Sequence, residues 1–119
     1  MKGDGTVLLV DDDCDVRCSF AEVLRTAGYR VLEAEDGLSA QERLKSDDVG
    51  VVLLDVFMPG LDGLSLLDEI ETPPPVALLT AHGYDEAIML RRSKVAMYIQ
   101  KPIAPLELLE AVARMFSPG

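Results

Sequence analysis

The sequence predicts an α/β fold with one parallel sheet, because short apolar runs alternate with amphipathic stretches along its 119 residues. Residues 51–54 are continuously apolar and run into Asp55, which is typical of a strand buried on both faces. Strands that alternate with helices form a parallel sheet covered on both faces, with right-handed crossovers. We therefore expect a single doubly wound (βα)5 domain over residues 1–119, with an ordered core from about residue 5 to residue 116.

Each expected element has a local signal. The strands are expected at residues 6–10, 29–34, 49–54, 76–79 and 95–99, and the helices at residues 16–27, 38–45, 64–70, 85–94 and 105–116. Gly28 ends the first helix as a glycine after the C-cap does, and Pro105 opens the last helix in its first turn. The last helix has an apolar face that we expect to be buried, formed by Leu106, Leu109, Val112, Ala113 and Phe116.

The composition excludes some classes of partner. Lys and Arg total 11 against 21 Asp and Glu, so the net charge of −10 argues against direct nucleic-acid binding. No apolar run approaches the length of a membrane span, and residues 1–5 contain no signal-peptide core. Cys14 and Cys18 would share one helix face, and we expect reduced thiols in a cytoplasmic protein. No further soft ligand accompanies them, so we do not expect a metal site there.

Polar side chains follow four of the five expected strands at the point where each strand ends. The end of the second strand carries no comparable signal. In open α/β sheets, ligands bind at the carboxyl edge of the strands, so these side chains should converge on one crevice. They are Asp11, Asp12 and Asp13 after the first strand, Asp55 after the third, Thr80 after the fourth and Lys101 after the fifth.

These motifs together resemble a receiver domain of two-component response regulators. The matching residues, in the expected order over nearly the whole chain, are Asp11-Asp12, Asp55, Thr80-Ala81, Tyr98 and Lys101-Pro102. The resemblance implies a flavodoxin-like sheet of order 2-1-3-4-5, as in chemotaxis response regulators. It implies a signalling switch, and not an enzyme beyond its own phosphorylation and dephosphorylation. It also implies a histidine kinase or phosphotransfer protein as the phosphoryl donor.

Phosphoryl transfer to a carboxylate would assign roles to these residues. Asp55 would be the nucleophile that forms an acyl phosphate, and a cation is needed because carboxylate and phosphoryl groups repel each other. Mg²⁺ prefers oxygen ligands, which Asp12 and Asp55 can supply directly, with Asp11 holding a water. The resemblance implies that the backbone carbonyl of Phe57 is a further ligand.

The remaining residues of the motif would neutralise charge and report the modification. Lys101 can pair with a phosphoryl oxygen, and the Thr80 hydroxyl can donate to another. Thr80 and Tyr98 would form the switch that reads the modification. The resemblance implies a cis bond between Lys101 and Pro102. Asp13 is expected to cap the following helix.

The output surface is expected on the fourth helix, fifth strand and fifth helix. Residues 87–90 are four consecutive apolar residues, so at least one must face solvent or a partner. Arg91, Arg92 and Lys94 follow, a basic group suited to an acidic partner or to a second copy. In receiver domains the position of Lys94 usually holds a small residue, so this chain departs from the family pattern on this face.

Three other classes of protein share part of this pattern. A haloacid dehalogenase-type phosphohydrolase also uses an aspartate nucleophile, but its motif requires Thr or Val where Asp15 stands, and its chain is longer. An EF-hand calcium loop would need glycine at the position of Val16. A flavodoxin would need a Gly- and Thr-rich phosphate loop after the first strand. We expect either a single-domain regulator or a receiver domain that continues into an effector domain beyond residue 119.

Overall fold

The described part of the chain alternates strands and helices as the sequence predicts. The computed structural model describes residues 5–46, 48–56, 63–70, 74–80, 89–90 and 92–116. The fourth helix is expected at 85–94, and most of that range lies outside these residues; of its described part, Met89 is helical and residues 92–94 form a 3₁₀ helix. The elements are β1 (Thr6–Val10), α1 (Cys14–Thr26), β2 (Arg30–Ala34), α2 (Gly37–Ser46), β3 (Val51–Asp55), α3 (Gly63–Glu69), β4 (Val76–Thr80), η1 (Arg92–Lys94), β5 (Met97–Gln100) and α5 (Pro105–Phe116).

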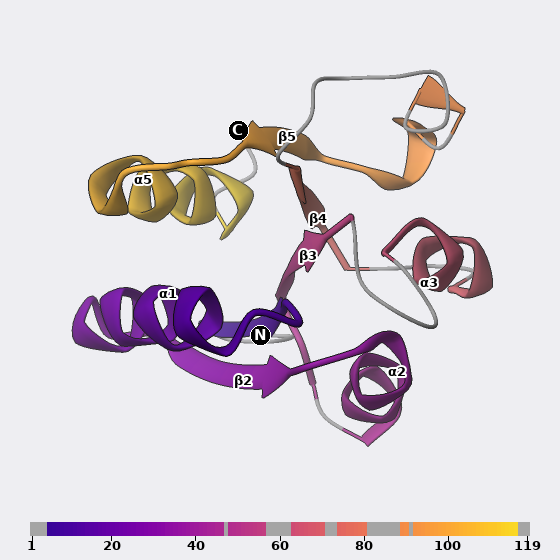
Figure 1. The fold of residues 1–119 in the computed structure, drawn as a ribbon, viewed down its shortest axis with the longest axis horizontal. Helices are drawn as coiled ribbons and strands as arrows, with labels where there is room; N and C mark the ends of the chain where they lie inside the picture. The colour runs from indigo at the N-terminus through magenta and orange to yellow at the C-terminus, as the bar shows by residue number, and fades with distance from the viewer. Residues whose placement is uncertain are drawn as a thin grey trace.

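The strands form one parallel sheet in the order β2-β1-β3-β4-β5, which confirms the expected topology. Figure 1 shows α1 and α5 on one side of this sheet and α2 and α3 on the other. In the register, Val10 pairs with Leu54, and Asp55 pairs with Leu79. The residues that follow β1 therefore lie beside the last residue of β3, at the carboxyl edge of the sheet.

The core consists of two apolar layers, one on each face of the sheet. Every residue of β1, β3 and β4 is buried, because helices cover both faces of these interior strands. Successive residues of β1 alternate between the layers: Leu8 and Val10 pack on one side, Val7 and Leu9 on the other. This rigid sheet holds its carboxyl edge in a fixed arrangement.

The buried face of α5 agrees with the predicted one only in part, since Val112 is buried and Leu109 and Phe116 pack against the core. Leu108, Ala111 and Val112 are buried, whereas Leu106 is 73% exposed and Ala113 is also exposed. Positions 108, 111 and 112 follow the spacing of three and four residues that keeps side chains on one helix face. Leu106 lies two positions earlier, about 200° around the helix from Leu108, so it points away from the sheet.

Aspartate side chains cap the starts of α1 and α2, and a glycine follows the end of α1. The Asp13 carboxylate accepts hydrogen bonds from the backbone N–H groups of Asp15 at 3.0 Å and Val16 at 3.3 Å, which confirms the predicted cap. Gly28 has a φ of 102° after the C-cap of α1, as the sequence predicts. At α2, Asp36 accepts a hydrogen bond from the Ser39 N–H at 2.8 Å, and that bond lowers the pKa of the Asp36 carboxyl.

Among the described helices, none has the length and apolar character needed to cross a bilayer.

Candidate functional site

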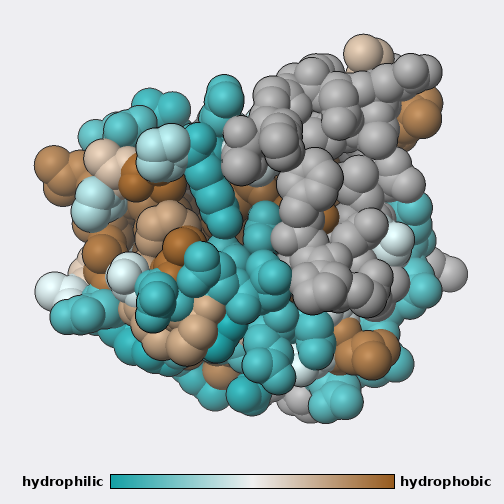
Figure 2. Space-filling view, viewed as in Figure 1, coloured by the Kyte–Doolittle hydropathy of each residue, from teal (hydrophilic) through white to brown (hydrophobic). Residues whose placement is uncertain are grey.

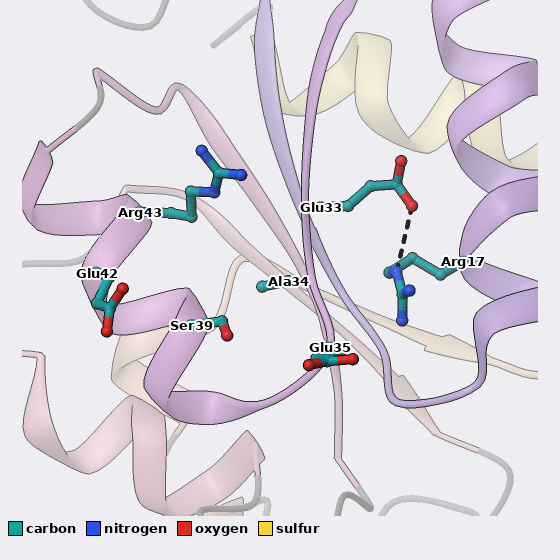
Figure 3. Close-up of a pocket in the computed structure, with 7 residues that line it drawn as sticks. All are labelled: Arg17, Glu33, Ala34, Glu35, Ser39, Glu42 and Arg43. Carbon is teal, nitrogen blue, oxygen red and sulfur yellow. Dashed lines mark hydrogen bonds and ion pairs between the residues drawn. The ribbon is translucent and has the colours of Figure 1, made fainter.

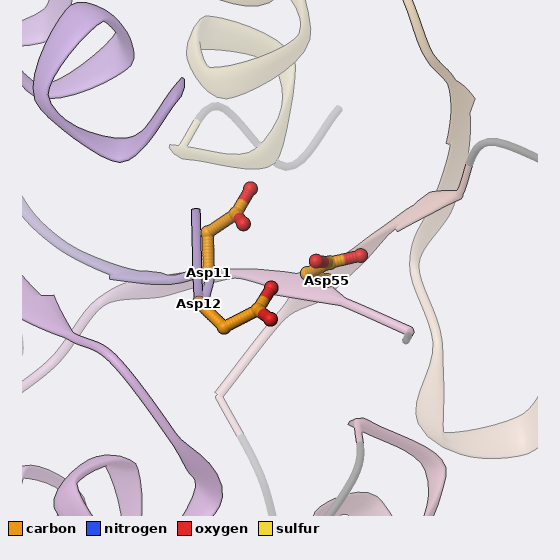
Figure 4. A group of neighbouring side chains, drawn as sticks. All are labelled: Asp11, Asp12 and Asp55. Atoms are coloured by element: carbon orange, nitrogen blue, oxygen red, sulfur yellow. The ribbon is translucent and has the colours of Figure 1, made fainter. Parts of the chain in front are cut away.

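Three carboxylates converge at the carboxyl edge of the sheet. Asp11 directly follows β1, and its backbone N–H donates to the Ala34 carbonyl at 3.1 Å, which extends the ladder by one residue. Asp55 is the last residue of β3. Figure 4 shows Asp11, Asp12 and Asp55 gathered at this edge, and each offers a carboxylate oxygen within 4.8 Å of the others. Among the residues that the structure describes, this is the only cluster of three or more potential metal ligands.

Lys101 supplies the positive charge beside this cluster. Its ammonium nitrogen lies 2.9 Å from Asp11 Oδ2 and 3.8 Å from Asp55 Oδ2. The backbone N–H of Lys101 donates to the Thr80 carbonyl at 2.7 Å, which fixes the lysine next to the end of β4. The Lys101–Pro102 bond is cis, as predicted.

The charges of the cluster do not balance. Asp11 is fully buried and Asp55 is 7% exposed, so both carboxylates are largely removed from water. The cluster therefore contains three carboxylate groups, two of them buried, beside one ammonium group. Buried charge of this kind is costly unless it is paired or bound to a metal. A divalent cation with oxygen ligands therefore fits the donors present, and Mg²⁺ is such a cation.

The three consecutive aspartates after β1 divide into two roles. Asp11 and Asp12 belong to the carboxylate cluster, whereas the Asp13 side chain caps α1. The backbone N–H of Asp13 donates to Asp11 Oδ1 at 2.9 Å, so the start of α1 helps to orient the buried carboxylate. The cap and the cluster are therefore linked by one short stretch of backbone.

Arg17 is a residue of the site that the sequence reasoning missed. Its guanidinium donates to the backbone carbonyl of Asp11 at 2.6 Å and, through Nε, to Glu33 Oε1 at 3.2 Å. Figure 3 shows the Arg17–Glu33 pair, which joins α1 to β2. A signal was available: Arg17 lies four and seven residues before the buried Ala21 and Leu24, so it is a basic residue on the buried face of α1.

The expectation that the end of β2 carries no polar signal was wrong. Glu33 and Glu35 flank Ala34 there, at a polar depression of about 370 Å³ that also includes Ser39 and Arg43 of α2 (Figure 3). β2 is one of the two edge strands of the sheet, so side chains at its end remain within reach of solvent. The Arg17–Glu33 pair places one of these acids next to the loop that carries Asp11.

Thr80 and Tyr98 lie on neighbouring strands. Thr80 is the last residue of β4 and is buried, with 3% of its surface exposed. Tyr98 pairs with Leu78, two residues before Thr80, and packs against the apolar layer on the side of α2 and α3. Because residues two apart on a strand share a face, Thr80 and Tyr98 lie on the same face of the sheet. Phe57, the expected carbonyl ligand, lies outside the described residues.

The predicted output surface is only partly described. Met89 is 43% exposed and Leu90 is 74% exposed, which confirms that at least one of residues 87–90 faces outward. The interpretation of Lys94 as part of an exposed basic group was wrong. Its ammonium donates to the backbone carbonyls of Leu67 at 3.0 Å and Ile70 at 2.7 Å, so it binds the end of α3.

Comparisons with known proteins give one consistent family. A family model described as "Response regulator receiver domain" matches residues 7–113. The phosphate regulon transcriptional regulatory protein PhoB of Pseudomonas aeruginosa is 37% identical over 123 residues, covering 96% of this chain and 54% of that protein. The DNA-binding transcriptional regulator NtrC of Escherichia coli is 35% identical over 117 residues, covering 95% of this chain and 25% of that protein. The chain thus spans about half or less of the length of these relatives.

Solved structures agree with this result. A CheY-like receiver domain protein from Methanospirillum hungatei matches with a TM-score of 0.80 and 34% identity, covering 89% of each chain. Chemotaxis protein CheY4 of Vibrio cholerae matches with a TM-score of 0.86 and 27% identity, covering 92% of this chain and 97% of that one. These comparisons do not favour the phosphohydrolase alternative.

Proposed function

The chain belongs to the receiver-domain family of two-component response regulators, and on this premise we propose that Asp55 is the residue that accepts the phosphoryl group. The observation that carries the proposal is the meeting of Asp11, Asp12, Asp55 and Lys101 at one edge of the sheet. Asp55 ends the central strand β3, so the surrounding sheet holds its carboxylate in place.

Asp55 would attack the phosphorus atom of a phosphohistidine on a kinase or phosphotransfer protein. The new bond joins a carboxylate oxygen to phosphorus, the bond from phosphorus to the donor nitrogen breaks, and the imidazole leaves with the electron pair. Small acyl phosphates would donate in the same way. The protein contributes position and charge, which supply most of the catalysis in phosphoryl transfer.

Asp11, Asp12 and Asp55 are the described residues that would hold Mg²⁺, with Phe57 as the expected carbonyl ligand. When bound, the ion would supply the positive charge that lets a phosphoryl group approach a carboxylate. Lys101 now lies closer to Asp11 than to Asp55, at 2.9 Å against 3.8 Å. After transfer, its ammonium can pair with a phosphoryl oxygen on Asp55 and share its charge between both groups.

The donor protein needs a surface beside the site. A largely apolar groove of about 560 Å³ lies between α1 and the segment that joins β5 to α5, and it is lined by Val16, Phe20, Lys101 and Ile103 among others. Figure 2 shows brown apolar side chains among the polar ones on the side where α1 and α5 lie. Because Lys101 belongs both to this groove and to the carboxylate cluster, a donor bound here would reach Asp55.

Phosphorylation would be read through Thr80 and Tyr98. Thr80 is the residue at the end of β4 whose hydroxyl can donate to a phosphoryl oxygen. Tyr98 lies on the same face of the sheet and can repack when Thr80 turns. The surface over β5 and α5 would then bind a partner protein or a second copy, and the exposed Met89 and Leu90 are candidates for its apolar contacts.

The test is phosphoryl labelling of the intact protein. Incubated with Mg²⁺ and a small acyl phosphate, the parent protein should gain the mass of one phosphoryl group, and Asp55→Asn should gain none. Asp48→Asn is the matched control, because Asp48 is exposed and lies outside the carboxylate cluster. Labelling of Asp55→Asn at the rate of the parent protein would contradict the proposal.

A further inference from the structure

Two exposed thiols lie side by side on the first two turns of α1. Cys14 Sγ and Cys18 Sγ are 3.8 Å apart, within hydrogen-bonding distance for sulfur, and both cysteines are free. The hydrogen bond to Cys14 raises the pKa of the Cys18 thiol, so this thiol stays protonated up to a higher pH than an isolated one. Phosphoryl transfer has no use for a thiol, so the proposed function leaves this pair without a role.

We propose that Cys14 and Cys18 form a reversible dithiol–disulfide pair, and that closing the disulfide releases the Asp13 cap of α1. The co-reactant is a low-molecular-weight disulfide. One cysteine attacks a sulfur of this disulfide, forms a mixed disulfide and expels one small thiol; the second cysteine then attacks the protein sulfur and expels the other. The protein loses two electrons and two protons, and the small disulfide gains both as it becomes two thiols.

The helix brings the two cysteines within reach of a disulfide but does not match its preferred shape. Residues four apart in an α-helix have Cα atoms roughly 6 Å apart, inside the range of about 4.4–6.8 Å that disulfides span. Their Cβ atoms are about 5–6 Å apart in a regular helix, whereas a disulfide prefers about 3.8 Å. Closure must therefore draw one cysteine toward the other and distort the turn between them.

When the disulfide closes, the Cys14 end of α1 is the part that moves. Cys18 lies in the second turn and is followed by Ala21 and Leu24, which are fully buried against the sheet. Cys14 is the first residue of α1, where the backbone N–H has no partner within the helix. Its neighbour Asp13 must move with it, so the hydrogen bonds from Asp15 and Val16 to the Asp13 carboxylate are the first to break.

This movement also reaches the carboxylate cluster. The Asp13 N–H donates to Asp11 Oδ1 at 2.9 Å, and Asp12 lies between these two residues in the chain. Oxidation would therefore disturb the acidic ligands and weaken Mg²⁺ binding, a consequence that rests on the proposed function. By linkage, bound Mg²⁺ would in turn oppose closure of the disulfide.

The disulfide is tested by equilibrating the protein in buffers of reduced and oxidised glutathione, followed by alkylation and intact mass measurement. The parent protein should lose both alkylatable thiols together and carry no glutathione. Cys14→Ser and Cys18→Ser each keep one thiol, so each should carry one glutathione instead. A parent protein that accumulates glutathione adducts, or keeps both thiols where the single variants react, would overturn the proposal.

Release of the cap is tested separately by amide hydrogen exchange at Asp15 and Val16. Exchange at both amides should be at least about tenfold faster in the oxidised protein, because they lose the Asp13 acceptor. The double variant Cys14→Ser/Cys18→Ser should show no change in the same buffers. Unchanged protection in protein whose disulfide is verified by mass would overturn this part.

The link to the metal has its own readout. Mg²⁺ should bind several-fold more weakly to the oxidised protein than to the reduced protein, and equally well to the double cysteine variant in both buffers. Equal affinity in the two states of the parent protein would overturn the link. Absence of Mg²⁺ binding in the reduced protein would contradict the proposed function instead, while the mass measurement still decides the disulfide.

Discussion

Lys101 and Lys94 lie near opposite ends of β5, and their ammonium groups bind different kinds of partner. Lys101 follows the strand at the carboxyl edge of the sheet and contacts the charged side chains of Asp11 and Asp55. Lys94 precedes the strand and donates to the backbone carbonyls of Leu67 and Ile70. The negative end of the α3 dipole attracts the second lysine, whereas excess carboxylate charge attracts the first.

The difference teaches that residue type alone does not identify a functional site. Both lysines are partly buried and both satisfy their ammonium groups. Only Lys101 contacts carboxylates that the proposed phosphoryl transfer would change. We therefore expect substitutions at the carboxyl edge to alter chemistry, and substitutions near the other end of β5 to alter stability.

The largest expected effect is that of Lys101→Ala. It removes the cation that can pair with a developing phosphoryl charge, so labelling of Asp55 should slow on the order of 100-fold. The measurement is the rate of mass gain with a small acyl phosphate. Lys45→Ala, at an exposed position in the last turn of α2, is the control and should label normally. If Lys101→Ala were to label at the parent rate, the distinction between the two lysines would fail.

The next effect separates neighbouring acids at the same edge. Asp12→Ala removes a carboxylate of the cluster and should weaken Mg²⁺ binding by at least tenfold, since even outer partners of metal sites contribute that much. Asp13→Ala should change Mg²⁺ affinity far less, but should lower the free energy of unfolding by about 1 kcal/mol through loss of the cap. Calorimetric titration and denaturant unfolding measure the two quantities. Equal losses of Mg²⁺ affinity in Asp12→Ala and Asp13→Ala would show that Asp12 is wrongly assigned as the ligand.

Lys94→Met tests the other end of β5. It removes the charged donor from two carbonyls at the end of α3, so the free energy of unfolding should fall by about 1–2 kcal/mol. Phosphoryl labelling should keep its parent rate. Denaturant unfolding with Lys45→Met as control measures the first effect. If Lys94→Met slowed labelling and left stability unchanged, Lys94 would act on the chemistry and the contrast with Lys101 would be wrong.

The smallest effect concerns an acid near the carboxyl edge that belongs to no cluster. Hydrogen bonds from Ser39 lower the pKa of Asp36, so its stabilising effect is present above the ordinary value of 3.8 and is lost as pH falls through the folded-state pKa. Asp36→Asn keeps a capping side chain but removes this titration. Thermal midpoints should therefore depend less on pH in Asp36→Asn than in the parent protein, in the acid range only. A difference in this pH dependence near neutral pH would point to a titrating group other than Asp36.

Local sequence signals were sufficient for the strands and for two of the caps. The apolar run before Asp55 predicted a buried central strand with the acid at its end, because only a strand covered on both faces is apolar throughout. Asp13 and Gly28 were predicted from the backbone needs of helix ends, which involve only a few neighbouring residues. The position of the carboxylate cluster followed from the shared carboxyl edge of the strands, once the fold was a parallel sheet.

Local signals failed where a side chain chooses among distant partners. Leu106 is apolar and helical, yet it is exposed, because the direction of the buried face depends on how α5 packs against the sheet. Lys94 was read as part of a surface group, but its partners are carbonyls more than twenty residues earlier. The spacing of residues along one helix predicts neither the exposure of Leu106 nor the partners of Lys94.

By itself, the sequence determined the fold, the strand that carries Asp55 and the acids available to it, because hydrophobic period and helix capping act over a few residues. The tertiary structure decided which of these groups meet. It placed the Lys101 ammonium between Asp11 and Asp55, and it brought the Arg17 guanidinium to the Asp11 carbonyl. These contacts join residues from separate strands and helices, so their distances depend on the packing of the whole sheet and its covering helices.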